Sequence, residues 1–482
     1  MLLTVLNLPF SAKYLIINLP FRAGRAIIAE KAVEIMILKR KIYDKLVDWK
    51  RESNGSTALL IGGARRVGKS FVAKEFGENE YKSYILIDFA VAPQEIKDLF
   101  VHDTGDLELF FQKLSLYYSV TLYKRQSLII FDEVQQYPLA RQFVKYLVAD
   151  GRYDYLETGS LIRLKKNSKD IVIPSEEEHI DMFPLDFEEF LWALGDTTTA
   201  AALKGFFDKK QPLGDAVHRK IMNAFKQYML VGGMPQSVLA YLPEKSFERA
   251  DRAKRAIINL YREDVAKFAE GYEDRVFAIF DNIPAQLSKK EKKFKVSALN
   301  KAARFRTYKD AFIWLNEAMI TNSCYNCTDP KIGLALSAEE STLKCYMGDT
   351  GLLVTLAFMD MPYAENELYR AILFDKLGIN EGMVMENIVA QMLRSQGRTL
   401  YFYSHSDTDH RENHMEIDFL ISKNKKITPI EVKSARYQQH SSLDKFIKKF
   451  KGRYNQPCIL YTKDVMEKDG ILHLPVYMAM FL

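Results

Sequence analysis

The chain has 482 residues, of which 48% are hydrophobic and 27% are charged, and its formal net charge is +6. This length is too great for one hydrophobic core and predicts two to four domains, while the composition is that of a folded soluble protein. Four cysteines exclude a disulfide framework in a chain this long, so we expect a reduced, cytoplasmic environment. The mild positive charge permits contact with nucleic acid but does not require it.

Residues 1–35 form an apolar and rather basic extension of doubtful status. Pro9 and Pro20 interrupt its apolar stretches, and no run approaches the ~20 residues of a membrane-spanning helix. Stable membrane insertion is therefore not expected. Because an amphipathic helical pattern begins cleanly at Met36, we favour Met36 over Met1 as the start of the protein, in preference to a targeting segment.

Residues 36–195 alternate short apolar runs with helical patterns. Strands are expected at 58–61, 84–89, 127–131, 153–158 and 179–183, and helices at 69–76 and 139–148. Short buried strands that alternate with helices predict a parallel sheet covered on both faces. We therefore expect an α/β core in this part of the chain.

A glycine-rich loop, Gly63-x-x-x-x-Gly68-Lys69-Ser70, follows the first expected strand and opens the first expected helix. Glycines allow backbone N–H groups to wrap phosphate oxygens, and the helix N-terminus adds partial positive charge. Lys69 is expected to reach the β- and γ-phosphates of ATP, and Ser70 to ligate Mg²⁺. The expected nucleotide-binding residues are Gly63, Ala64, Arg65, Arg66, Val67, Gly68, Lys69 and Ser70.

Two acids, Asp132 and Glu133, follow the third expected strand about 60 residues after the loop. A carboxylate at Asp132 suits the ligand shell of Mg²⁺, and Glu133 lies where a general base could orient the attacking water. Thr158 and Ser160 end the next strand, at the sheet edge where such sites form, and are expected to hydrogen-bond this water or the γ-phosphate. An ordinary Thr-Gly-Ser turn is the alternative for these two residues.

Residues 196–365 become helical, and helical patterns followed by strand candidates at 324–327 and 344–346 are the order of a winged helix. Residues 289–309 contain nine Lys or Arg and one acid, Glu291, with aromatic residues interleaved. Such a segment could contact the phosphates of DNA or RNA. A solvated helical face explains it equally well.

Residues 366–482 form a third α/β unit. Its expected elements are a helix at 382–395, strands at 399–404, 415–421 and 427–432, a helix at 443–450 and a strand at 458–461. Glu386 lies on the first helix and Asp418 on the second strand, while Glu431 and Lys433 share one face of the third strand. A hairpin brings Asp418 towards that pair. The three carboxylates could hold Mg²⁺ while Lys433 orients or activates water, or stabilises charge on phosphate; cross-strand ion pairing is the alternative.

Several segments together resemble the prokaryotic ATP-binding AAA-type P-loop family, in which a P-loop core precedes a C-terminal domain of unknown function. They are the loop at 63–70, Phe131-Asp-Glu-Val-Gln135, Glu157-Thr-Gly-Ser-Leu161, Met182-Phe-Pro-Leu-Asp-Phe-Glu-Glu-Phe-Leu191, Tyr228-Met-Leu-Val-Gly-Gly-Met-Pro235 and Tyr261-Arg-Glu-Asp-Val265. The resemblance implies ATP binding and Mg²⁺-dependent hydrolysis in an AAA-type fold. AAA ATPases often complete the site with an arginine, for which Arg163 and Arg262 are candidates.

The rest of the chain carries two further resemblances. The middle region is similar to the winged-helix segment of the same family, which leaves nucleic acid or protein as its partner. The unit at 366–482 resembles the restriction-endonuclease-like fold with its Asp…Glu-x-Lys signature, here Asp418, Glu431 and Lys433, with Glu386 added from the helix.

Three functions stay open from the sequence. The leading one is an ATP-hydrolysing switch or motor that controls the C-terminal half and acts on DNA or RNA. The second is a Mg²⁺-dependent nuclease gated by ATP, with Asp418, Glu431 and Lys433 at its centre. The third is a protein-interaction switch whose nuclease-like domain is catalytically inert. The sequence leaves the partner and the oligomeric state undecided.

Overall fold

The computed structural model describes residues 38–161, 174–289, 292–361, 381–405, 414–423, 425–434 and 437–482. Residues 39–482 belong to one compact unit, and all features discussed below lie in it. Met36 and Arg163 lie outside the described residues. Among the residues that are described, no helix is long and apolar enough to cross a membrane.

The first sheet is parallel, with the strand order β2-β3-β4-β1-β5, and it confirms the α/β core expected from the sequence. Its strands are β1 (Ala58–Gly62), β2 (Ser83–Asp88), β3 (Ser127–Asp132), β4 (Asp154–Gly159) and β5 (Glu177–Asp181). The helices of this part are α1 (Ile42–Ser53), α2 (Lys69–Glu80), α3 (Gln94–His102), α4 (Leu107–Tyr118), η1 (Val134–Gln136), α5 (Pro138–Asp150) and α7 (Phe187–Ala193). Every residue of β1, β3 and β4 is buried, as the short apolar runs predicted.

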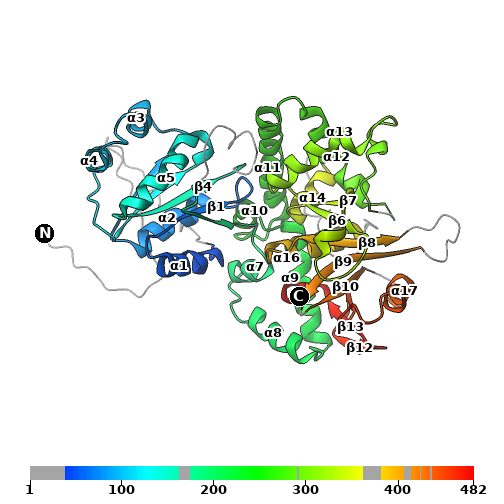
Figure 1. Ribbon diagram of the computed structural model, residues 1–482. Coiled ribbons are helices and arrows are strands. Elements are labelled where there is room, and N and C mark those ends of the chain that lie inside the picture. Colours follow the sequence, from blue (N-terminus) through cyan, green and yellow to red (C-terminus); the bar gives the residue numbers. More distant parts are fainter. Residues whose placement is uncertain are drawn as a thin grey trace, which may run out of the picture. The chain divides into compact units, whose positions relative to one another are not determined.

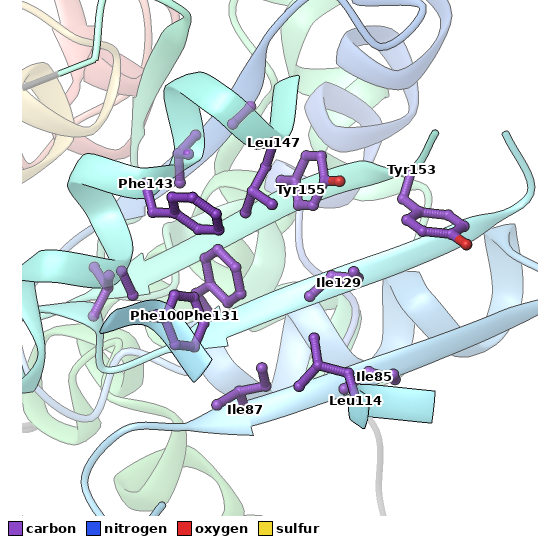
Figure 2. Close-up of a cluster of buried hydrophobic side chains, with 14 of the residues drawn as sticks. Ile85, Ile87, Phe100, Leu114, Ile129, Phe131, Phe143, Leu147, Tyr153 and Tyr155 are labelled. Atoms are coloured by element: carbon purple, nitrogen blue, oxygen red, sulfur yellow. The ribbon is translucent and has the colours of Figure 1, made fainter. Parts of the chain in front are cut away.

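Helices cover both faces of this sheet. On one face, a hydrophobic core joins the strands to α3, α4 and α5, and Figure 2 shows Phe131 of β3 beneath Phe143 of α5. Phe100 of α3 meets Phe131 and Phe143 edge-on, at ring-centroid distances of 5.6 and 5.9 Å. On the other face, α2 packs against β2, β3 and β4, where Ile130 lies close to Gly77. This layering fixes the carboxyl ends of β1, β3 and β4, which carry the expected site residues.

The middle region is mainly helical, and it ends in a pair of strands. Its elements are α8 (Thr199–Lys209), α9 (Asp215–Val231), α10 (Pro235–Tyr241), α11 (Phe247–Phe268), α12 (Glu273–Leu287), η2 (Val296–Ala298), α13 (Phe305–Glu317), β6 (Thr321–Cys327), η3 (Leu334–Ser337), β7 (Ala338–Met347) and α14 (Thr350–Ala357). Strands β6 and β7 form an antiparallel pair, and β6 also pairs in parallel with β8 of the C-terminal part. The strand candidates near 324 and 344 therefore belong to a larger sheet.

The second sheet is mixed, with the order β12-β13-β11-β10-β9-β8-β6-β7. Its C-terminal elements are α16 (Glu381–Ser395), β8 (Leu400–His405), β9 (Met415–Lys423), β10 (Lys426–Lys433), α17 (Ser441–Lys449), β11 (Cys458–Tyr461), β12 (Met466–Lys468), β13 (Ile471–Pro475) and η5 (Val476–Phe481). The expected β9–β10 hairpin is confirmed, whereas β12 and β13 were not expected. Helix α16 packs against β6, β7, β8 and β10 of this sheet (Figure 1).

The segment Val231-Gly-Gly-Met-Pro235 joins the core to the helical region through backbone contacts. The N–H of Leu185 donates to the carbonyl of Gly233 at 2.7 Å, and the N–H of Gly233 donates to Asp349 Oδ2 at 2.6 Å. A Cβ atom at position 233 would lie 2.1 Å from the carbonyl oxygen of Leu185. Since that neighbour is backbone, only glycine fits here without moving the main chain.

Gly233→Ala is therefore expected to destabilise the protein by about 1–3 kcal/mol, the usual cost of overpacking a tight site. Gly205→Ala is the matched control, because a Cβ there meets nothing within 4 Å inside α8, where alanine is the better helix former by roughly 0.5–1 kcal/mol. Urea unfolding of both variants measures the difference. Equal stability of the two variants would contradict the close approach at Gly233.

Candidate nucleotide site

The loop between β1 and α2 has the backbone conformation that its glycines permit. Gly68 has φ +100°, in the left-handed region, and a Cβ at Gly63 would lie 2.5 Å from the carbonyl oxygen of Met182. Lys69 is buried, and its ammonium group donates to the carbonyls of Gly63 and Ala64 at 3.0 and 3.1 Å. The lysine therefore lies over the cradle formed by the loop.

Arg40 holds the loop through hydrogen bonds to backbone carbonyls of the loop and of the segment before α7. Its Nη1 donates to the carbonyl of Val67 at 2.8 Å, and its Nη2 donates to the carbonyl of Phe183 at 2.6 Å. Its Nε lies 3.2 Å from Glu189 Oε1, and both side chains are 6% exposed. Glu189 also completes a capping box with Asp186 at the start of α7. The loop and the segment before α7 are thus held by one buried guanidinium group.

Ser70 and Asp132 lie side by side, as a shared Mg²⁺ shell requires. Ser70 Oγ donates to Asp132 Oδ1 at 2.7 Å, and Thr158 Oγ1 donates to the same oxygen. Burial raises the pKa of Asp132, and the two hydroxyl groups oppose this shift. A hydroxyl and a carboxylate in contact are hard oxygen donors, so these residues fit Mg²⁺ bound together with ATP. Thr158 is buried, and it orients Asp132 from within the sheet.

Glu133 follows Asp132 in a conformation that non-glycine residues seldom adopt, with φ +51°. Its backbone N–H donates to Thr158 Oγ1 at 3.3 Å, and its Oε2 accepts from Ser160 Oγ at 3.2 Å. The side-chain amide of Gln135 donates to the same carboxylate oxygen. Three groups thus orient Glu133, which suits a base that must position a water molecule.

A cavity of about 380 Å³ opens above the loop. It is lined by residues of the loop, of the acidic strand ends and of the helices α10 and α11: Arg65, Arg66, Gly68, Lys69, Ser70, Phe71, Ala90, Glu133, Gln135, Gln136, Ser160, Leu161, Pro235, Gln236, Asp264, Lys267 and Phe268. Lys69, Ser70, Glu133 and Ser160 line this cavity, whereas Thr158, which we expected to hydrogen-bond the attacking water or the γ-phosphate, does not and contacts Asp132 and Glu133 instead. The contribution of the helical region was not predicted.

Helix α11 holds the loop from the other side. Asp264 Oδ1 accepts from Arg65 Nη1 across 199 positions of sequence, and the Asp264 side chain is 2% exposed. Tyr261 Oη donates to the carbonyl of Arg65 at 3.1 Å. Burial raises the pKa of Asp264, and Arg65 opposes this shift. Tyr261 and Asp264 both lie in the segment Tyr261-Arg-Glu-Asp-Val265, which the sequence marked only as part of the family resemblance and not as a contact with the loop.

Of the two candidate arginines, only Arg262 is among the described residues. Its Nη2 lies 2.6 Å from Asp281 Oδ1 of α12, and it does not line the cavity. The cation that α11 contributes to the cavity wall is Lys267.

The four C-terminal site candidates lie within one region of the second sheet. Asp418 Oδ2 accepts from the backbone N–H of Val432 at 2.9 Å, next to Glu431 and Lys433, which pair at 2.6 Å. Glu386 and Asp418 both contact Lys344 of β7. Among the described residues, no group of three or more His, Cys, Asp or Glu side chains could hold a metal ion. The structure therefore brings the four residues together, but it pairs them with lysines.

Family comparisons divide the chain into three matched parts. An AAA domain matches residues 55–191, a domain of unknown function (DUF8612) matches 222–363, and a second domain of unknown function (DUF4143) matches 381–477. No curated protein matches the chain.

Solved structures show only weak likeness. A signal-transduction ATPase with numerous domains and a tetratricopeptide repeat sensor, from Pyrococcus horikoshii, is 10% identical with a TM-score of 0.26, covering 74% of this chain and 48% of its own. The chain thus spans about half the length of that protein. Drosophila ORC bound to DNA is 12% identical with a TM-score of 0.28, covering 66% of this chain and 95% of its own. Likeness at this level carries no functional argument.

The family match and the geometry agree on the nucleotide site. The matched residues 55–191 contain the loop, both acids and the two hydroxyl residues on β4 and after it. An AAA domain implies ATP binding and hydrolysis. The chain therefore carries an AAA ATPase domain, which is followed by two domains of unknown function.

Proposed function

We propose that the protein is an ATP-hydrolysing switch in which the nucleotide state of the loop controls the two C-terminal domains. The observation that carries this proposal is the composition of the cavity wall. Loop residues Lys69 and Ser70 form one side, and Asp264 and Lys267 of α11 form the other. Because α11 belongs to the second matched domain, a ligand in this cavity contacts two domains at once. Differential contact of this kind is what allows a ligand to shift a conformational equilibrium.

In this proposal each residue of the AAA domain has a distinct task. Lys69 and the loop N–H groups bind the β- and γ-phosphates, while Ser70 and Asp132 hold Mg²⁺. Bound Mg²⁺ neutralises charge on the phosphates. Glu133 accepts a proton from the attacking water, oriented by Ser160 and Gln135. Thr158 positions both acids without reaching the cavity.

A chain of buried hydrogen bonds supports coupling beyond α11. Tyr228 Oη donates to the carbonyl of Leu185 at 2.7 Å and accepts from Gln391 Nε2 of α16 at 3.1 Å. Gln391 Oε1 in turn accepts from the N–H of Thr350 at 2.7 Å. Leu185 lies in the matched AAA domain, Tyr228 in the first domain of unknown function and Gln391 in the second. Leu185 lies two residues from Phe183, whose carbonyl is bound to the same Arg40 that holds the loop.

For the C-terminal unit we propose a restriction-endonuclease-like fold, supported by the order α16, β8, β9, β10, α17, β11. For the middle region, α12, α13 and the β6–β7 pair support a winged helix. The nuclease alternative is less well supported than an inert domain, because the acids are paired with lysines. A protein-docking role is therefore the second candidate function.

The basic segment 289–309 is the feature from which we infer the class of partner. Phe294 and Phe305 are half-buried and pack on the buried Phe312, at ring-centroid distances of 5.0 and 5.7 Å. The exposed cations include Lys301, Arg304 and Arg306. A group of exposed cations suits contact with the phosphates of nucleic acid. We propose DNA or RNA as the first partner class to test.

ATP turnover in the presence of possible partners tests the proposal. The wild type is expected to hydrolyse ATP, and double-stranded DNA or RNA is expected to stimulate turnover in a salt-dependent manner. Arg304→Glu/Arg306→Glu should remove this stimulation, whereas Arg51→Glu, on the exposed face of α1, should retain it. Stimulation by nuclease-treated protein fractions would instead identify a protein partner. A folded wild type without any ATP turnover would contradict the proposed function.

A further inference from the structure

A buried lysine lies at the centre of the acidic residues in the C-terminal sheet. The Lys344 side chain is 0% exposed, and its Nζ lies 2.8 Å from Glu416 Oε1, 3.2 Å from Asp418 Oδ1 and 3.6 Å from Glu386 Oε2. Burial alone would lower the pKa of Lys344, but Tyr346 and the three carboxylates raise it well above its usual value. Lys344 is thus a charged ammonium group that three carboxylates surround.

This lysine comes from a strand distant from its partners in the sheet. Lys344 lies on β7 at the sheet edge, whereas Glu416 and Asp418 lie on β9, with β6 and β8 in between. Its ammonium group lies 5.2 Å from the ring centroid of Phe402 on β8. The side chain therefore crosses two strands to reach the carboxylates, and α16 packs over the same strands.

Glu386 and Glu431 each have a lysine partner other than Lys344. Glu386 accepts from Lys292 Nζ and, at 3.1 Å, from Tyr346 Oη. Glu431 Oε1 lies 2.6 Å from Lys433 Nζ. Glu431 Oε2 is buried without a hydrogen-bond partner among the described residues, and burial raises the pKa of Glu431 to about 7.

The lysines offset most of the negative charge of the cluster without a divalent cation. Four acids, Glu386, Glu416, Asp418 and Glu431, face the three lysines Lys292, Lys344 and Lys433. Mg²⁺ would need oxygen ligands at roughly 2.0–2.1 Å in octahedral geometry. Asp418 Oδ1 and Glu431 Oε1 instead lie against lysine ammonium groups, and Asp418 Oδ2 accepts the backbone N–H of Val432.

We infer that the ammonium group of Lys344 takes the place of the divalent cation that an Asp…Glu-x-Lys constellation would otherwise hold. The C-terminal domain then carries a metal-independent charge cluster that ties α16 to β7 and β9. The middle region contributes Lys292 and Lys344 to this cluster, and the C-terminal domain contributes the acids. The inference stands or falls independently of ATP hydrolysis at the loop.

Mn²⁺ binding to the nucleotide-free full-length protein tests the inference directly. The probe is free Mn²⁺ measured by electron paramagnetic resonance, with wild type and Asp418→Asn compared under the same conditions. We expect the two proteins to bind the same amount of Mn²⁺, because Asp418 has no vacant oxygen to offer. Mn²⁺ binding by the wild type that Asp418→Asn removes would overturn the inference.

A substitution of Lys344 provides the complementary experiment. Lys344→Met keeps the length of the side chain and removes its charge, so the carboxylates should repel one another and the thermal midpoint should fall. Millimolar Mn²⁺ should then raise the midpoint of this variant by several degrees, and the additional change Asp418→Asn should abolish that rise. A folded Lys344→Met protein that Mn²⁺ leaves unchanged would also overturn the inference.

The matched control is Lys254→Met. Lys254 is also fully buried, and its ammonium group donates to the backbone carbonyl of Leu230 at 2.6 Å. This variant also loses a buried charge and should therefore be less stable than the wild type. Mn²⁺ should not restore its stability. Rescue of both variants by Mn²⁺ would indicate a general effect of the cation and contradict a specific role for Lys344. If Lys344→Met does not fold, the comparison of wild type with Asp418→Asn decides the question alone.

Discussion

Lys69→Ala is expected to abolish ATP binding at the P-loop. In the structure Lys69 Nζ already lies over the loop, bonded to the carbonyls of Gly63 and Ala64, with no other lysine of the loop to replace it. Hydrogen bonds to charged groups contribute about 1.5–3 kcal/mol each. Loss of the two bonds that Lys69 is expected to make with the β- and γ-phosphates therefore predicts a fall in ATP affinity of roughly 10²-fold or more. Isothermal titration with a slowly hydrolysed ATP analogue and Mg²⁺ measures this change.

The pH dependence of binding gives the same residue a second test. Burial lowers the pKa of Lys69 to about 8, against the opposing charges of Glu133 and Asp132. Phosphate binding requires the protonated lysine, and a terminal phosphate with a second pKa near ~6 is already ionised at this pH. Affinity should therefore fall as pH rises above about 8, by up to about tenfold per unit. Lys74→Ala, on the exposed face of α2, should retain both affinity and pH profile, and a wild-type profile in Lys69→Ala would contradict the assignment.

Glu133→Gln is expected to bind ATP normally and to lose turnover. The amide keeps the size of the carboxylate and its contact with Ser160, but it cannot accept the proton of the attacking water. General-base catalysis contributes about 10²–10⁴-fold, so kcat should fall by that factor while the Kd for ATP stays within a few fold. Single-turnover hydrolysis together with equilibrium binding separates the two effects.

Glu78→Gln is the matched control for this substitution, because Glu78 is exposed on α2 and distant from the cavity lining. It should hydrolyse ATP at the wild-type rate. Unchanged hydrolysis in Glu133→Gln would remove Glu133 from its assigned role and move attention to Asp132 or Gln135 as the residue that orients water.

The parts of the fold that the sequence predicted are those set by local patterns. Short apolar runs placed β1 and β3 within a residue or two, because a strand buried on both faces is mostly apolar. The edge strand β5 is polar and partly exposed, and it begins two residues before the strand expected at 179–183. The β9–β10 hairpin followed from alternation on either side of a short polar turn. Strands β12 and β13 escaped notice, since β12 is three residues long and polar, and periodicity needs a longer window.

The nucleotide site likewise contains residues that local sequence patterns predicted and long-range contacts that they did not. Lys69, Ser70 and Asp132 were predictable, because loop spacing and strand ends fix their positions by local geometry. The contact between Arg65 and Asp264 was not, since 199 positions separate them and no pattern within either segment specifies the pairing. Lys344 was missed for the same reason. A single lysine in a strand reads as an exposed residue, and only the packing of β7 under α16 buries it.

Nucleotide at the loop is expected to alter the C-terminal domains, and amide hydrogen exchange measures this directly. Glu133→Gln would be compared with and without Mg²⁺ and ATP, with Glu133→Gln/Tyr228→Phe as the variant that lacks the hydroxyl between Leu185 and Gln391. We predict that ATP changes exchange in α11 and also in α16, and that the second change weakens without the Tyr228 hydroxyl. A response confined to residues 55–191 would contradict the account, because the ATPase domain would then act alone.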